Sequence, residues 1–311
     1  MDNKMHPRIK ILVACHKADP NIRHDDIYMP IQVGKALHPE LDLGFQCDNT
    51  GDNISEKNGS YCELTALYWA WKNLKDVDYI GLCHYRRYFD FSKNNSALKP
   101  IKSDEFHLLK NNVFAPIINR NEVFLPSFTY LPHSVGMDFQ KTVLTEDMYI
   151  LYKILEKYYP EDMYILYKIL EKYYPEYLSV FSNYMTGNHR TGFNMFLMSF
   201  ALFRDYATWL FDILGKVEDR IKLSEYISYK RVFGYMGEFL LPIYCIKNLL
   251  KIKEHQVMFV TDEKIRYRGN GITQMRNFLN QIAFNIGRLG QNNELHDSYW
   301  EMYLKADGIK I

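Results

Sequence analysis

The segment His84-Tyr85-Arg86-Arg87 groups the residues of this sequence best suited to bind an anion. It follows a short apolar run, Tyr79–Cys83, which is typical of a buried strand. Each arginine offers a rigid fork of donors to phosphate oxygens, and two arginines with a histidine could neutralise a diphosphate. Ligands of open α/β sheets bind beyond the carboxyl ends of strands, which favours this function over an arginine pair bridged to acids such as Asp90.

Two further polar groups lie where they could help to bind the same ligand. His16 and Lys17 follow the first strand-like run, Ile9–Cys15. A polar loop, residues 51–59, precedes a helix-like segment, residues 61–74, and its side chains could hydrogen-bond a nucleotide or a sugar or simply form a solvated turn. The loop residues in question are Asp52, Asn53, Ser55, Lys57 and Asn58.

Candidate catalytic and acceptor-binding residues lie later in the chain. Arg231 and Glu238 are seven residues apart in an aromatic helical segment, so they share one helix face. Glu238 is either a general base or half of a structural ion pair. Asn194 is the one polar residue in the apolar run 193–198, and His133 lies in an irregular segment, residues 127–138.

No sequence motif indicates a metal site or another familiar reaction. The chain lacks a Walker loop, GxGxxG, GxSxG, HExxH and paired CxxC spacing, and no DxD triplet ends a strand. Asp25-Asp26 lies in a loop, and Asp76-x-Asp78 precedes its strand instead of ending it. We therefore expect no bound metal. The formal net charge of +1 gives no reason to expect nucleic acid as a partner.

Alternating strand and helix patterns predict an α/β fold with a mostly parallel sheet flanked by helices. Besides the runs named above, we expect a second strand over residues 41–46, a short helical turn over residues 31–37 and a central strand over residues 193–198. We expect one domain over residues 1–260 and a helical tail over residues 261–311. Four arginines of this tail could touch phosphates or anionic lipid: Arg266, Arg268, Arg276 and Arg288.

A 15-residue sequence, EDMYILYKILEKYYP, occurs twice without a difference, at residues 146–160 and 161–175. Each copy has a helical pattern of apolar residues, and Pro160 disfavours one straight helix through both. We expect two short helices or a kinked one, projecting at the surface and without a role in an active site.

Cysteine usage and hydropathy favour the cytoplasm. The chain has five cysteines, an odd number, and its first residues lead into a strand-like run without a signal-peptide pattern. The most apolar window, residues 193–214, is interrupted by Arg204 and Asp205, so we expect no spanning helix. The expected location is the cytoplasm, with at most peripheral contact at the inner face of the cytoplasmic membrane.

Several blocks of this sequence resemble a bacterial family first described as domain of unknown function 4422. The two most specific blocks are NIS-x-KN-x-x-YCELTALYWAWKN at residues 53–73 and DYIGLCHYRRYF at residues 78–89. The resemblance extends to His16-Lys17, Pro30-Ile31-x-Val33-Gly34, Asn194-Met195-Phe196, Trp209-Leu210-Phe211-x-Ile213-Leu214 and Arg231-x-x-Gly234-x-x-x-Glu238. Members of that family occur in capsule, exopolysaccharide and O-antigen gene clusters and are regarded as glycosyltransferases.

The resemblance implies a GT-A-like, Rossmann-related transferase that moves a hexosyl unit, such as galactose or galactofuranose, from a nucleotide sugar to a growing saccharide. The implied partners are a UDP-sugar donor and a lipid-linked or oligosaccharide acceptor. Many GT-A enzymes hold a metal at a strand-end DxD, and His84-Tyr85-Arg86-Arg87 occupies the comparable place here. We therefore expect a metal-independent enzyme, with Glu238 as the first candidate base and Asp52 as the second.

Two other classes of protein stay open on the sequence alone. A non-catalytic carbohydrate-binding or assembly protein would account for the many tyrosines, 25 in all. A nucleotidyltransferase could use the same arginines, but it usually needs metal-binding acids that this sequence does not present.

Overall fold

The computed structural model describes residues 7–94, 98–108, 121–138, 165–221, 223, 230–267 and 269–289. The chain separates into two units, which are described here one at a time. The first comprises residues 1–128, 191–208 and 231–274, and the second comprises residues 129–190, 209–230 and 275–311. The domain boundary expected at residue 260 stays a prediction.

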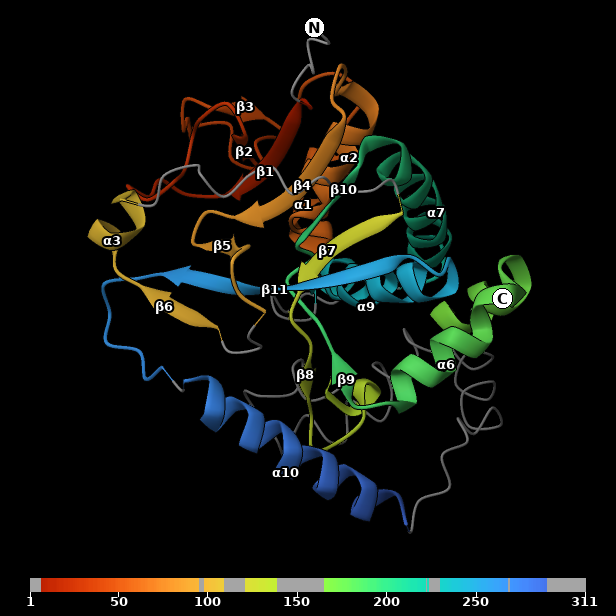
Figure 1. The fold of residues 1–311 in the computed structure, drawn as a ribbon. Helices are drawn as coiled ribbons and strands as arrows, with labels where there is room; N and C mark the ends of the chain where they lie inside the picture. Colours follow the sequence, from red (N-terminus) through yellow and green to blue (C-terminus); the bar gives the residue numbers. More distant parts are fainter. Residues whose placement is uncertain are drawn as a thin grey trace, which may run out of the picture. The chain divides into compact units, whose positions relative to one another are not determined.

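The first unit contains a large sheet with the strand order β10-β7-β11-β5-β4-β1-β2-β3, and β6 lies beside β11 (Figure 1). Its strands are β1 (Ile9–Cys15), β2 (Tyr28–Gln32), β3 (Gln46–Cys47), β4 (Tyr79–His84), β5 (Arg87–Asp90), β6 (Lys99–Ile101), β7 (Glu122–Pro126), β10 (Phe196–Ser199) and β11 (Lys251–Val260).

The centre of this sheet is parallel, as the sequence predicts. β1 lies between β2 and β4 and runs parallel to both, with Ala14 beside His84 in the register. β1 and β4 are nearly continuous apolar runs because a strand inside a parallel sheet is covered on both faces. The carboxyl ends of β1 and β4 therefore meet at one edge, where His84 ends β4 and His16 follows β1.

The sheet as a whole is mixed, so the α/β fold is confirmed but a mostly parallel sheet is not. β4 turns back through Tyr85 and Arg86 into the antiparallel β5, a connection that two residues can make without a crossover helix. β10 pairs antiparallel with both β4 and β7. The pairing β4-β5-β11-β7-β10 thus returns to β4 and closes a barrel-like ring.

Two elements were expected between β1 and the polar loop, a helical turn over residues 31–37 and a strand over residues 41–46, and both predictions are wrong. Residues 28–32 form strand β2, and the second strand is reduced to the two residues of β3. Pro30 lies within β2 although proline cannot donate to a sheet ladder. It is tolerated because β3 pairs with Ile31 and Gln32 alone, which leaves Pro30 on an effective edge.

Helices of the first unit surround this sheet. They are η1 (Ser55–Lys57), α1 (Asn58–Tyr61), α2 (Leu64–Asn73), α3 (Ser103–Leu108) and α9 (Val232–Lys247). α9 is buried on most of its circumference, as expected for a helix that is apolar all round. It packs on α1, where the rings of Tyr61 and Phe233 stack with centroids 4.5 Å apart.

The second unit contains the short antiparallel pair β8 (Thr129–Tyr130) and β9 (His189–Arg190), with η2 (Pro175–Tyr177) and α6 (Leu178–Thr186). α7 (Phe200–Glu218) and α10 (Asn270–Arg288) each contribute residues to both units. No helix among the described residues combines the length and the apolar content that crossing a bilayer requires.

The described part of the sequence duplication is helical over residues 165–173. The first copy, residues 146–160, lies outside the described residues. The expectation that the copies project at the surface is wrong for the second copy, because its apolar stripe is fully buried: Ile165, Leu166, Ile169 and Leu170. A helix with such a stripe must bury it against other elements.

Gly81 lets β4 and β10 approach each other at the centre of the ring, and this gives a prediction of stability. A Cβ at Gly81 would lie 2.7 Å from the Phe196 carbonyl oxygen, which is main chain and cannot swing away. We expect Gly81→Ala to lower the free energy of unfolding by about 1–3 kcal/mol, measured by urea denaturation. Gly215→Ala is the matched control, since a Cβ there meets nothing within 4 Å. An equal loss in both variants would contradict the close approach.

Candidate functional site

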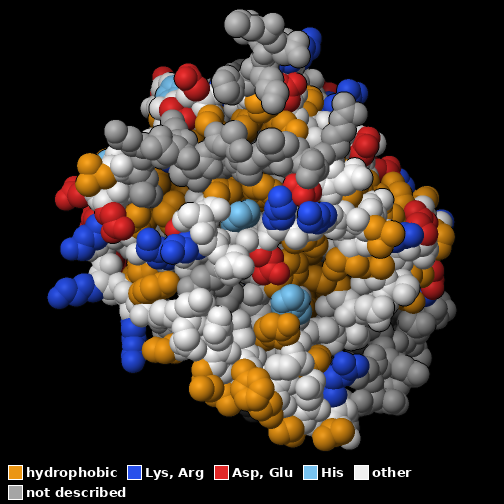
Figure 2. Space-filling model, in the orientation of Figure 1, with side chains coloured by type: hydrophobic (Ala, Val, Ile, Leu, Met, Phe, Trp, Pro, Cys, Tyr) orange, Lys and Arg blue, Asp and Glu red, His pale blue; other side chains and the backbone are white. Residues whose placement is uncertain are grey.

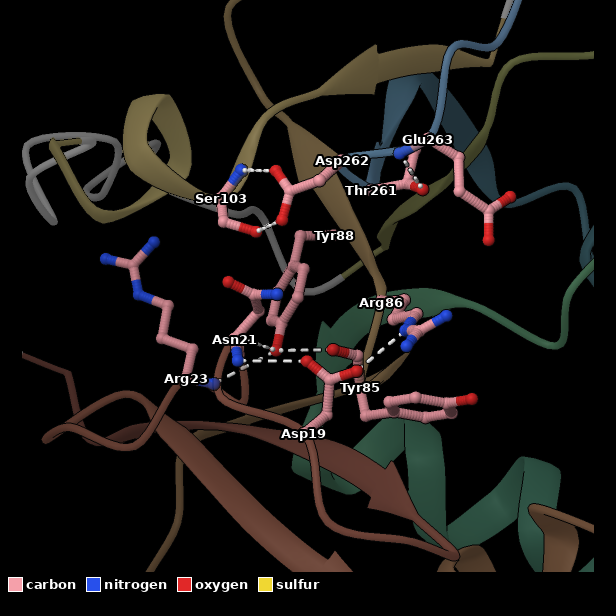
Figure 3. A network of polar contacts seen from close by, with 10 residues as sticks. All are labelled: Asp19, Asn21, Arg23, Tyr85, Arg86, Tyr88, Ser103, Thr261, Asp262 and Glu263. Atoms are coloured by element: carbon pink, nitrogen blue, oxygen red, sulfur yellow. Dashed lines mark hydrogen bonds and ion pairs between the residues drawn. The ribbon is translucent and has the colours of Figure 1, made fainter.

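Arg86, in the turn between β4 and β5, and Arg87, at the start of β5, have different surroundings: Arg86 pairs with an acid, and Arg87 lies against an aromatic ring. The Arg86 Nε donates to Asp19 Oδ2 at 2.7 Å, and the Asp19 side chain is 2% exposed (Figure 3). Burial opposes ionisation of Asp19, but hydrogen bonds from the Asn21 amide and from Arg86 hold its pKa below the ordinary value. Arg86 thus has an acidic partner, as in the alternative interpretation of the arginine pair, but this partner is Asp19, on the loop after β1, and not Asp90. Figure 3 shows the Tyr85 ring and the Arg86 guanidinium on the same side of the turn.

Tyr85 connects the end of β1 to this turn. Its ring meets the His16 ring edge-on at 5.1 Å, and the Lys17 ammonium lies 5.7 Å from its centroid. Burial and then the positive charges of Lys17, Arg231, His84 and Arg86 lower the pKa of His16. The residues predicted from the ends of β1 and β4 therefore form one cationic cluster, in which His16 is neutral at pH 7.

His84 points from the end of β4 toward the segment before β10. Its Nε2 donates to the Phe193 carbonyl oxygen at 2.6 Å, which fixes the proton on that nitrogen. Burial above all lowers the pKa of His84, although Glu63 opposes the effect. At neutral pH, His84 thus supplies a hydrogen bond and the arginines supply the positive charge.

Phe193 and Asn194 adopt left-handed backbone angles, with φ of 74° and 52°. Such angles cost about 1–3 kcal/mol for residues with side chains, so the surroundings must hold them. The Asn194 side-chain amide does so by donating to Glu63 Oε1 at 2.6 Å and to the Gly234 carbonyl oxygen at 2.9 Å. Asn194 is 3% exposed and therefore positions Glu63 from below the surface.

Two glycines let α9 come close to these groups. A Cβ at Gly237 would lie 2.8 Å from Asn194 Oδ1, and one at Gly234 would lie 3.1 Å from Cys62 Sγ. Arg231, just before α9, donates from Nε to that sulfur at 3.2 Å. Burial raises the pKa of Cys62 to about 11, so the arginine meets a neutral thiol.

Arg87 is the most enclosed cation of the cluster. Its guanidinium lies 4.9 Å from the centroid of the Phe193 ring. Burial lowers the pKa of Arg87, whereas the negative charges of Glu238 and Glu63 raise it. Arg87, Glu238 and Glu63 therefore interact electrostatically at the carboxyl end of β4, the region that the sequence identified from the arginines.

The polar loop before α2 is built largely from its own side chains. Ser55 is fully buried and donates to Asp48 Oδ1, and Asn58 donates to the Cys62 carbonyl oxygen at 2.7 Å. Asn53 Oδ1 accepts from the Ser55 amide. The Lys57 ammonium lies 5.9 Å from the centroid of the Tyr61 ring. Their proposed contacts with a donor stay predictions.

Asp52 and His133 each contact partners of their own. Asp52 is exposed, accepts from the Tyr68 hydroxyl at 3.2 Å and lies 3.9 Å from the Lys72 ammonium. His133 belongs to the second unit, where its Nε2 is 3.0 Å from Asp138 Oδ1 and Arg190 pairs with the same carboxylate. Their catalytic and acceptor-binding roles stay predictions.

Sequence reasoning missed two acids and one aromatic residue of this site. Glu63 stands at the start of a helix, and its bond to Asn194 joins residues 131 positions apart, which no local pattern reveals. Asp19 carried a signal, since it follows His16-Lys17 closely and opposes their charge. Phe193 carried none, because its role depends on a strained backbone that no pattern predicts.

Basic, acidic and histidine side chains gather near the middle of the face drawn in Figure 2. In the part of the chain that the structure describes, no group of three or more His, Cys, Asp or Glu side chains is arranged to hold a metal ion.

The fold and the site define an α/β protein whose strand ends carry arginines, neutral histidines and carboxylates, as ligand-binding α/β proteins do. Residues 10–249 match the model of a family described as a domain of unknown function (DUF4422), and the chain belongs to this family.

A solved structure resembles this chain in both sequence and fold. It is titled the apo structure of the WbbM bifunctional glycosyltransferase, is 32% identical and superposes with a TM-score of 0.66. The match covers 83% of this chain and 46% of that one, so this chain spans less than half of its neighbour. No curated protein sequence matches significantly.

The state of His84 can be tested directly. We expect ring-nitrogen NMR shifts to show a neutral Nε2–H imidazole at pH 6.5, because burial lowers its pKa. In the unfolded chain, a histidine has its ordinary pKa of about 6.5. The unfolded state then binds more protons as the pH falls below that value, so His84 makes the fold less stable in acid.

His84→Gln is the matching variant, since a glutamine amide can still donate to the Phe193 carbonyl oxygen. Its unfolding free energy should fall less steeply than that of the wild type between pH 6.5 and pH 5. An imidazolium signal for His84 at pH 6.5 would contradict the assignment.

Proposed function

We propose that this protein is a glycosyltransferase that moves a hexosyl unit from a nucleotide sugar to a saccharide acceptor. The observation that carries the proposal is the electrostatic interaction of Arg87 with Glu238, in the turn where Arg86 follows the carboxyl end of β4. Glycosyl transfer from a nucleotide sugar needs cations for a departing diphosphate and a carboxylate for the acceptor hydroxyl. The similarity to a chain titled a glycosyltransferase supports the same class.

The donor diphosphate is proposed to bind across the β4–β5 turn. Arg86 and Arg87 neutralise its charge, and His16, Lys17 and the Tyr85 hydroxyl add hydrogen-bond donors beside them. Arg87 is held over Phe193, so little side-chain freedom remains to be lost when the anion arrives. Stabilisation of the leaving group by these fixed cations is what makes a divalent ion dispensable in this scheme.

Glu238 is proposed as the general base. It accepts the proton of the acceptor hydroxyl while that oxygen attacks the anomeric carbon and the bond to the diphosphate breaks. Glu63, one of whose oxygens accepts from Asn194, is proposed to be held in place beside this base. Asp52 stays the second candidate. The donor is proposed to be a UDP-sugar, with galactose or galactofuranose as its hexose, and the acceptor a lipid-linked or oligosaccharide chain of a capsule, exopolysaccharide or O-antigen.

The proposed metal independence has a simple test. We expect turnover of the UDP-sugar to survive EDTA, because the arginines supply the positive charge that a divalent ion would provide. The measurement is nucleoside diphosphate release, with and without chelator, across a panel of donors. Loss of turnover in EDTA that Mn²⁺ or Mg²⁺ restores would refute this part of the proposal.

The arginines and Glu238 should affect different kinetic constants. We expect Arg87→Ala to raise the donor KM about 10- to 100-fold, since it removes a charged hydrogen bond. Glu238→Gln should lower kcat about 100-fold or more and leave donor binding unchanged. Both effects are read from initial rates at varied donor concentration, with donor affinity from calorimetry.

Arg8→Ala is the control for a lost surface charge, because Arg8 pairs with Asp76 and Asp78 at the amino end of β1. It should leave both kinetic constants unchanged. Wild-type turnover in Glu238→Gln would remove Glu238 from the role of base.

A further inference from the structure

The part of α10 that belongs to the second unit, residues 275–288, has an apolar outward face. In α10, large apolar side chains recur at spacings of three and four residues, which puts them on one face. Figure 2 shows hydrophobic side chains gathered over this helix. They are between 40% and 87% exposed: Met275, Phe278, Leu279, Ile282, Ile286 and Leu289.

The inward side of the same helix is mostly polar. The Asn280 side-chain amide donates to the Tyr130 carbonyl oxygen at 2.7 Å, and Asn277 is half-buried. Phe284 is buried on this side at 7% exposure. A surface helix ordinarily turns its apolar stripe to the core, so the reversed orientation of α10 indicates that its outer face meets a second apolar phase.

The charge around this face is positive. Residues 264–289 contain five basic residues and no acidic one. Among the described basic side chains, Lys264, Arg266, Arg276 and Arg288 are all exposed. An apolar stripe flanked by arginines is the pattern of helices that lie in the interface of an anionic bilayer.

We propose that α10 docks this protein on an anionic lipid bilayer, with its apolar stripe among the acyl chains and its arginines at the lipid phosphates. The complementary charge of the phosphates favours this occupant. A second copy of the chain would instead bring two arginine-bearing helices together. This inference stands on α10 alone and does not depend on the glycosyltransferase proposal.

The test is flotation of the full chain with vesicles of phosphatidylcholine containing phosphatidylglycerol. We expect binding to these vesicles that weakens as salt rises, and little binding to pure phosphatidylcholine. The double variant Leu279→Ser/Ile282→Ser should lose about tenfold or more in affinity, since two large side chains leave the lipid phase. The double variant Arg276→Gln/Arg288→Gln should lose about fivefold for each charge and should depend less on salt.

A matched control is Gln274→Ser/Asn285→Ser, which changes two exposed polar residues of the same helix and should bind like the wild type. Circular dichroism and melting temperature show that every variant is folded. Absence of wild-type binding to anionic vesicles would overturn the proposal. A dimer in light scattering that Leu279→Ser/Ile282→Ser dissociates would also overturn it, because the face would then contact a second copy. If the wild type does not bind vesicles and this variant has a lower melting temperature, the face contacts another part of this chain and the proposal fails.

Discussion

A buried carboxylate, Asp48, holds together the segments on which the site is built. It is fully buried and accepts hydrogen bonds from the Gly34 and Lys35 amides and from the Ser55 and Thr65 hydroxyls. These four donors come from the turn after β2, from η1 and from α2. A buried acid without its partners is strongly unfavourable, so the three segments can move only together. The start of α2 is thereby fixed against the sheet.

A short series of contacts connects the start of α2 to the candidate site. Cys62 and Glu63 lie at the start of α2, and Glu63 holds the Asn194 amide. Asn194 in turn stabilises the left-handed backbone whose carbonyl group, at Phe193, accepts from His84. Hydrogen bonds of the Asn194 amide therefore offset the strain of that backbone. One of them is made to Glu63, at the start of α2, and Asp48 holds that end of the helix through Thr65.

The sequence identified the parts of this site whose signal is local. A run of apolar residues ending in His84-Tyr85-Arg86-Arg87 predicts both a strand and a cationic edge, and the parallel pair β1 and β4 follows from composition. The sequence did not reveal that β10 closes the ring beside β4, because antiparallel pairing with a remote strand leaves no periodic pattern. Asn194 was a candidate for acceptor binding, but its bond to Glu63 escaped for the same reason, since no local pattern places these two residues side by side. The sequence suggested that Ser55 binds a ligand. A serine that donates a hydrogen bond to a buried acid, as Ser55 does to Asp48, cannot be distinguished by sequence from one that binds a sugar.

The charges of the site balance one another before any ligand arrives, and this bears on the proposed chemistry. His16 and His84 are neutral chiefly because burial disfavours their charged forms, and the neighbouring arginines add to this effect. Glu238 and Glu63 partly neutralise Arg87. A diphosphate that enters this cluster competes with those carboxylates for the guanidinium. In the proposed reaction, donor binding would weaken the attraction of Arg87 for Glu238 and make the Glu238 carboxylate a better proton acceptor. In the proposed reaction, the base becomes effective when the leaving group is in place, which favours transfer to an acceptor after the donor is bound.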